Sequence, residues 1–170
     1  MRSRARARPE TERPGTPCQA RPWRKGQALA STAACGYRQL VGTVVKLAVN
    51  GTLMRGLELN ANMLEAKATF LRDATTAPAY RLWSVNDRHP AMIRVASGGA
   101  PIALEVWAVS PEGLAQILMR EPPGLCIGKV TLSDGEEVLG VLGEPMLCEG
   151  QREITQYGGW RAYMASRQSP

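Results

Sequence analysis

The sequence predicts an α+β fold built on a small mixed barrel or curved sheet. Six or seven short segments rich in branched apolar residues are typical of strands, and residues 111–120 carry clear helix signals. An Asp-Gly pair at 134–135 lies between two apolar runs, which is the pattern of a β-hairpin. These features indicate one domain with a core of its own and no internal repeat.

Residues 1–40 differ from the rest of the chain in composition. They carry nine basic and two acidic residues and few branched apolar ones, so we expect a disordered basic tail. Two alternatives are an organelle transit peptide, which the four prolines between positions 9 and 22 disfavour, and a translation start further downstream. Residues 41–170 hold 12 basic and 13 acidic residues and are nearly neutral. The tail has few aromatic residues to stack on bases, so no nucleic-acid partner is expected.

The cysteines and the single histidine form no metal-binding pattern. The four cysteines include no CxxC pair, and His89, beside Pro90, is interpreted as a surface turn residue. We therefore expect neither a metal nor a cofactor. Free thiols are typical of a reducing compartment, which favours a cytoplasmic location. No segment has the roughly 20 continuous apolar residues of a membrane helix, so no membrane partner is expected.

The expected domain spans residues 41–165 and is followed by a flexible polar end at 166–170. Its first strand, residues 43–49, is β-branched and apolar throughout, as expected for a largely buried strand. Residues 102–109 alternate and place Glu105 on a strand, where it is either a second buried acid or the ion-pair partner of Arg94 or Arg81. Further strands are expected at 70–71, 80–85, 91–95, 125–132 and 138–142, and a short helix or ordered loop at 57–68. Residues 153–155 and 157–163 are expected to close the domain.

The helix at 111–120 has a signal at each end. Ser110 is a suitable N-cap, and Pro111 stands at the first helical position, where its missing N–H does no harm. Apolar residues at i, i+3 and i+4 from Leu114 form one buried stripe. Pro122-Pro123 ends the helix.

Glu121 stands between this helix and the two prolines. The following proline moves Glu121 out of the helical conformation, and both the helix C-terminus and apolar neighbours disfavour its charged form. A carboxyl with a raised pKa suits a general acid or base. The alternative is a solvated glutamate at a helix end.

Residues 49–56 interrupt the first strand with Asn50-Gly51 and end in a second glycine. A strand that breaks in this way can leave successive backbone N–H groups unpaired, and such a nest binds a carboxylate or phosphate. The alternative is a simple turn.

Several runs, in order, resemble one superfamily. Residues 50–56 resemble the Tyr-Gly-x-Leu loop of the γ-glutamylcyclotransferase-like superfamily, and residues 47–163 are more closely similar to the C-terminal domain of allophanate hydrolase. The matching runs are 75–82, 105–107, 123–130, 134–135 and 153–163.

This resemblance implies a six-stranded mixed β-barrel with flanking helices. It also implies that backbone N–H groups of Gly51, Thr52 and Leu53 hold a substrate carboxylate or carbonyl, and that Glu121 transfers protons. The other expected substrate-binding residues are Asn50, Arg55, Tyr80 and Arg161.

Three positions differ from one or the other of the related families. The usual tyrosine of the loop is Asn50 here, and allophanate hydrolase domains commonly have a histidine near Thr52 and often lack a glutamate at position 121. This sequence has no counterpart of the Ser-Lys amidase half, so hydrolysis of allophanate by this chain alone is not expected.

Three functions remain open on this resemblance. One is lysis or decarboxylation of a small carboxylated amide or urea-derived metabolite, and another is cyclotransfer on a γ-glutamyl compound. The third is a non-catalytic binding or assembly domain that pairs with a separately encoded amidase. A homodimer is compatible with all three.

Overall fold

The computed structural model describes residues 43–168. The expected disordered tail, residues 1–40, lies outside this range, and so do residues 169–170. None of the helices within 43–168 has the length and apolar character needed to cross a membrane.

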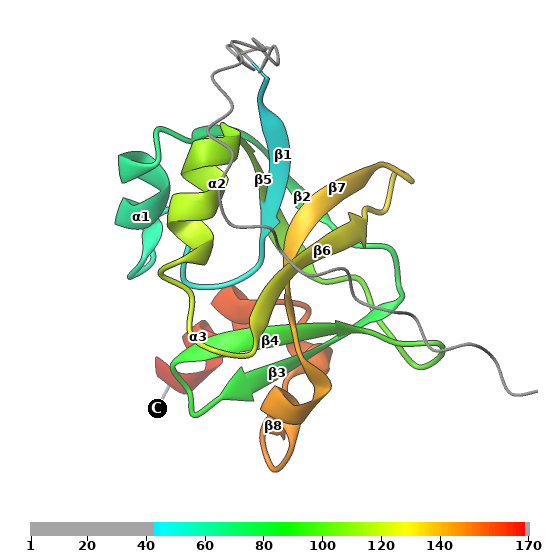
Figure 1. Cartoon of the computed structure of the whole chain (residues 1–170). Coiled ribbons are helices and arrows are strands. Elements are labelled where there is room, and N and C mark those ends of the chain that lie inside the picture. Colours follow the sequence, from blue (N-terminus) through cyan, green and yellow to red (C-terminus); the bar gives the residue numbers. More distant parts are fainter. Residues whose placement is uncertain (1–42, 169–170) are drawn as a thin grey trace, which may run out of the picture. The chain divides into compact units, whose positions relative to one another are not determined.

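Five strands form the larger sheet, in the order β2-β5-β1-β7-β6 (Figure 1). Its central strand, β1, pairs antiparallel with β5 and parallel with β7, so the sheet is mixed. A β-hairpin joins β6 to β7 through the predicted Asp134-Gly135 turn, where Gly135 has a φ of 86°. The strands are β1 (Val45–Val49), β2 (Thr69–Thr75), β5 (Ala103–Val109), β6 (Leu125–Thr131) and β7 (Glu137–Gly143).

Three strands form a second sheet, in the order β4-β3-β8. They are β3 (Tyr80–Val85), β4 (His89–Arg94) and β8 (Arg152–Glu153). The turn between β3 and β4 uses Asn86 and Asp87 with φ values of 50° and 56°, a conformation that Asn and Asp tolerate better than most residues.

The expected six-stranded barrel is wrong. Eight strands lie in two sheets, and no closed barrel forms within residues 43–168. The edge strands β2 and β6 are joined just beyond them by one isolated bridge between Thr76 and Leu132, beside which the Ala77 N–H donates to the Thr131 carbonyl at 2.9 Å. Because closure needs a continuous ladder between edge strands, one bridge leaves the sheet open.

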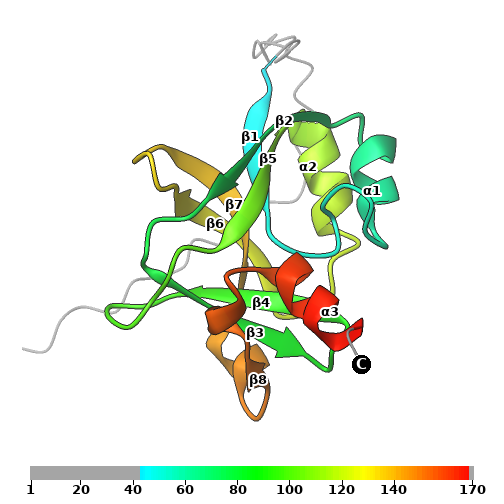
Figure 2. The same cartoon turned by 180° about the vertical axis from the view of Figure 1, so that it is seen from behind.

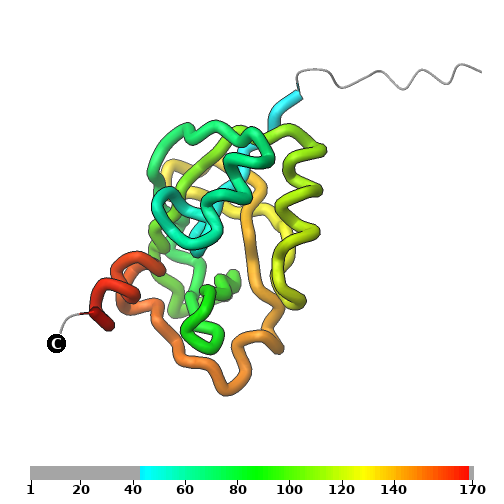
Figure 3. Tube along the Cα trace, turned by 90° about the vertical axis from the view of Figure 1, so that its left-hand side faces the viewer, coloured from blue at the N-terminus to red at the C-terminus, as the bar shows by residue number. Residues whose placement is uncertain are grey.

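Three α-helices flank the sheets: α1 (Asn60–Glu65), α2 (Pro111–Leu118) and α3 (Trp160–Gln168). The Ser110 side chain caps α2 as predicted, accepting the Gly113 N–H at 3.0 Å. Helices α1 and α2 lie beside β1 and β5, whereas α3 lies near β3 and β4 (Figure 2). The side view in Figure 3 shows α2 and α3 on opposite sides of the strands. Helix α3 continues into the range 166–170 that was expected to be a flexible end.

The main core lies between the larger sheet, α2 and α3. Leu47 of β1, Ile117 of α2 and Tyr163 of α3 are fully or almost fully buried within it. Strand β5 is buried on both faces rather than one, because β5 has paired neighbours on each side and packed elements above and below. This burial takes Glu105 out of water, so its carboxylate needs partners within the protein.

Candidate active site

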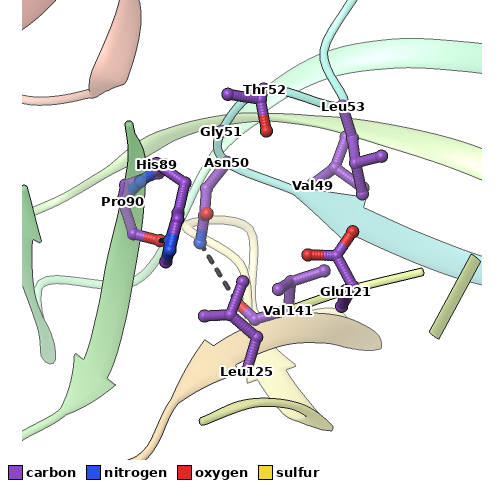
Figure 4. Close-up of a pocket in the computed structure, with 10 residues that line it drawn as sticks. All are labelled: Val49, Asn50, Gly51, Thr52, Leu53, His89, Pro90, Glu121, Leu125 and Val141. Carbon is purple, nitrogen blue, oxygen red and sulfur yellow. Dashed lines mark hydrogen bonds between the residues drawn. The ribbon is translucent and has the colours of Figure 1, made fainter. Parts of the chain in front are cut away.

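A pocket opens where β1 ends. Its walls come from the loop after β1, the start of β4, the segment after α2, and strands β6 and β7 (Figure 4). Its cavity volume is about 20 Å³, roughly the space of one water molecule and far below the roughly 300–1,000 Å³ of drug-sized sites, so a bound metabolite must lie partly in the open mouth or displace the lining side chains. The lining residues are Val49, Asn50, Gly51, Thr52, Leu53, His89, Pro90, Glu121, Leu125 and Val141.

The loop after β1 forms a turn that leaves backbone N–H donors free. The Met54 N–H donates to the Gly51 carbonyl at 3.0 Å, and the Leu59 N–H donates to the Thr52 carbonyl at 3.0 Å. The N–H groups of Thr52 and Leu53 have no acceptor within residues 43–168. Successive free N–H groups form a nest that binds a carboxylate or carbonyl oxygen. The run is therefore both a turn and a candidate anion nest.

Glycine is required at position 51 because of a close neighbour. A Cβ atom there would lie 2.6 Å from the Cδ and Cγ atoms of Pro90, far inside the contact distance. Pro90 is buried near the start of β4, and its ring has little freedom to move. The close approach of these two residues joins the loop to the second sheet and forms one wall of the pocket.

Replacing Gly51 by Ala is expected to lower the free energy of unfolding by about 1–3 kcal/mol, because the new methyl group overlaps the rigid ring of Pro90. The same overlap is expected to displace residues 50–55, the loop after β1, which we call the pocket loop. Urea denaturation measures the loss. Gly128→Ala is the matched control, since its Cβ meets only the flexible tip of Leu142, at 2.7 Å. Equal losses in the two variants would show that the Pro90 contact has no special role.

Glu121 lies across the pocket from the loop. Its backbone N–H donates to the Leu118 carbonyl at 3.2 Å at the end of α2, and Pro122 prevents further helix. Its Oε1 atom is buried and has no hydrogen-bond partner among the described residues. Burial raises the pKa of the Glu121 carboxyl and so favours its neutral form, which can donate a proton. Figure 4 shows this carboxyl group pointing into the space below Thr52.

Because the pKa of Glu121 is higher in the folded than in the unfolded chain, its ionisation destabilises the fold. The stability that the neutral Glu121 carboxyl contributes is fully present below the pKa of the unfolded chain, ordinarily 4.5. That stability is lost as pH rises through the pKa of the folded protein. Glu121→Gln is therefore expected to gain stability relative to the parent protein as pH rises above about 4.5. Urea titrations at a series of pH values measure this, and parallel curves for the two proteins would contradict a raised pKa.

Arg55 and Arg161, both predicted to bind substrate, do not line this pocket. Both bind Glu105, which is 1% exposed: the Arg55 Nε lies 3.2 Å and the Arg161 Nη2 2.8 Å from its Oε1. The backbone N–H of Arg55 and the Trp107 indole donate to its Oε2 at 3.0 and 3.1 Å. Arg161 also donates to the Arg55 carbonyl at 2.6 Å. This network fastens the far end of the pocket loop to β5 and α3.

Of the two alternatives for Glu105, the structure agrees with the buried acid and not with an ion pair to Arg94 or Arg81. Arg81 donates to the Gly98 carbonyl at 2.9 Å, and Arg94 donates to the Tyr80 hydroxyl at 2.9 Å. That hydroxyl also accepts the Thr131 N–H at 2.9 Å. Tyr80 is fully buried and links β3, β4 and β6, away from the pocket in which it was expected.

The structure thus brings five of the predicted site residues together in this pocket: Asn50, Gly51, Thr52, Leu53 and Glu121. The other three, Arg55, Tyr80 and Arg161, lie outside it. It adds His89, which is half-buried at the start of β4 and lines the pocket. The Asn86-Asp87 pair between two apolar runs is a hairpin signal, and it places His89 at the start of the second strand. No group of three or more metal-ligating side chains is found in the part of the chain that the structure describes.

The candidate site thus combines a loop with free backbone N–H groups and a half-buried glutamate, in a fold of two sheets. Two solved structures at 21% and 17% identity, from Pyrococcus horikoshii and Bacillus subtilis, share the fold with TM-scores of 0.57 and 0.60. The family model for the allophanate hydrolase C-terminal domain matches residues 45–165, and the chain belongs to this family.

Relatives of known name are mostly much longer proteins. The chain is 36% identical to urea amidolyase of Saccharomyces cerevisiae over 81% of its own length, but it spans 8% of that protein. It is 32% identical to the structure of Kluyveromyces lactis allophanate hydrolase, with a TM-score of 0.71. That match covers 74% of this chain and 22% of the Kluyveromyces lactis chain. The crystal structure of c4763, a uropathogenic E. coli-specific protein, is 58% identical with a TM-score of 0.71; 72% of this chain and 97% of that chain are covered.

Proposed function

We propose that this domain removes the carboxylate from a small carboxylated amide or urea-derived metabolite, with Glu121 as the acid. The single observation that carries the proposal is the unpartnered Oε1 of Glu121 in a pocket that also holds free N–H donors. A buried polar atom without a partner is costly, and a ligand that supplies a partner recovers that cost. The names of the yeast relatives, urea amidolyase and allophanate hydrolase, support the substrate class.

The proposed reaction balances with one proton. In a substrate R–CO–NH–COO⁻, the N–H donors of Thr52 and Leu53 hold the carbonyl oxygen. Neutral Glu121 gives its proton to the nitrogen as the bond from nitrogen to the carboxylate carbon breaks, so that R–CO–NH₂ and CO₂ form. Water then reprotonates the Glu121 carboxylate. Leu125 and Val141 supply an apolar wall, which favours loss of charge from the carboxylate as CO₂ leaves.

Two alternatives fit the same pocket. In a γ-glutamylcyclotransferase-type reaction, Glu121 takes the proton of the attacking amine and passes it to the leaving group. In a non-catalytic assembly domain, the pocket binds a ligand while a separate amidase does the chemistry. The small share of the yeast proteins that this domain spans favours the second alternative.

An intracellular location for any of these functions agrees with the free thiols of Cys126 and Cys148. A homodimer is compatible with each function.

Turnover by the full chain separates the three functions. The protein is incubated with allophanate and related N-carboxylated amides, and in parallel with γ-glutamyl amines. Bicarbonate release above the protein-free rate is the expected result, whereas formation of 5-oxoproline would favour the cyclotransferase reaction. Calorimetric binding of these compounds without turnover would favour the assembly domain and overturn the proposed chemistry.

A further inference from the structure

Asn50 occupies an unusual place for an amide side chain. It is 4% exposed and stands in the pocket wall directly after β1. Its Nδ2 atom donates to the Val141 carbonyl of β7 at 3.1 Å and lies 3.3 Å from the Met92 sulfur (Figure 4). Because a backbone carbonyl only accepts hydrogen bonds, this contact fixes which end of the amide is nitrogen.

The oxygen end of the amide is therefore fixed as well. Asn50 Oδ1 receives no hydrogen bond from any residue within 43–168, and it is not among the fully enclosed atoms that lack a partner. Since the rest of the side chain is buried and the residue lines the pocket, the pocket is where this oxygen is accessible. In Figure 4 the Asn50 amide and the Glu121 carboxyl group stand on opposite sides of that space.

The pocket thus offers two kinds of polar group in fixed places. The loop N–H groups of Thr52 and Leu53 are donors and suit a ligand oxygen. Asn50 Oδ1 can only accept, so a ligand N–H suits it and a carboxylate or ester oxygen does not. A site with a buried acceptor rejects a ligand that lacks the matching donor, because both acceptor and ligand then lose their bonds to water.

We propose that Asn50 determines specificity by accepting an N–H of the ligand, so that the site selects amides and ureas over esters of the same shape. This inference rests on the proposed function, since it assumes that the pocket binds a small carboxylated carbonyl compound. It goes beyond that function because it assigns to one side chain, Asn50, the preference for a ligand with an N–H over a ligand with an oxygen at the same position.

The test compares two ligands that differ only at this position. N-methylmalonamate and monomethyl malonate have the same charge and nearly the same shape, but the first has an N–H where the second has an ester oxygen. Calorimetry with the full chain is expected to show about tenfold or tighter binding of N-methylmalonamate, as for one buried hydrogen bond. In Asn50→Leu, which removes the acceptor at similar volume, the ratio is expected to fall below about twofold.

Asn62→Leu is the matched control, because Asn62 lies on α1, and its Oδ1 binds Arg120 at 3.0 Å outside the pocket. It is expected to keep the ratio of the parent protein. Should Asn50→Leu fail to fold, Asn50→Ala, which also removes the acceptor, is expected to lose the preference in the same way.

The outcomes separate this inference from the proposed function. Equal binding of the two ligands by the parent protein, or a preference that persists in folded Asn50→Leu, would overturn the role of Asn50 alone. Failure of both ligands to bind would overturn the proposed function, and the role of Asn50 with it.

Discussion

Replacing Glu121 by Gln is expected to lower kcat by about 10²–10⁴-fold, the usual contribution of a general acid. Glutamine keeps the size of the side chain but has no proton to transfer at the pH of the reaction. Because the loop N–H groups of Thr52 and Leu53 remain in place, substrate binding is expected to change little. Steady-state kinetics with the full chain, alongside binding measured by calorimetry, give the two quantities separately.

Glu112→Gln is the control for this substitution. Glu112 is an exposed glutamate in the first turn of α2, at the other end of the same helix. The Glu112→Gln protein is expected to keep the kcat of the parent protein. A Glu121→Gln enzyme within about threefold of the parent kcat would remove Glu121 from the chemistry. A loss of binding with no further loss in kcat would instead show that Glu121 only holds the ligand.

Replacing Glu105 by Leu is expected to lower the free energy of unfolding by about 2–3 kcal/mol, because a buried acceptor disappears from beneath several donors. The Arg55 backbone N–H and the Trp107 indole lose their acceptor at 3.0 and 3.1 Å. The two guanidinium groups add less to the loss, since their side chains are nearly half exposed and turn to water.

Urea denaturation measures this loss, with Glu112→Leu as the exposed control. Because Glu105 and Arg161 hold the N–H and the carbonyl of Arg55, at the end of the pocket loop, the folded Glu105→Leu protein is also expected to have a raised KM. A loss of stability below about 1 kcal/mol would show that the network contributes little to the fold.

The local elements of this fold were predictable because their signals are local. Ser110 and Pro111 mark the start of α2, and Asp134-Gly135 marks the hairpin of β6 and β7, each through backbone chemistry within a few residues. Glu121 is also marked locally, since the two prolines after it end the helix and turn its side chain away from the helix surface.

Long-range arrangement was not predictable from the same signals. Whether β2 and β6 join into a barrel depends on a ladder between strands far apart in the sequence, and only the Thr76–Leu132 bridge forms. Arg55 follows the pocket loop directly, yet it turns toward Glu105 because burial of that carboxylate demands partners. His89 joins the pocket only because the second sheet packs Pro90 against Gly51.

We propose that the pocket between the Thr52–Leu53 turn and Glu121 binds a carboxylated amide for proton transfer. A crystal structure of Glu121→Gln with such a compound bound tests this directly, since this variant is expected to bind without turnover. We expect a ligand oxygen within about 3.2 Å of the Thr52 or Leu53 nitrogen and the ligand amide nitrogen beside residue 121. A ligand seated instead in the separate cavity lined by Trp160 and Arg161 would contradict it.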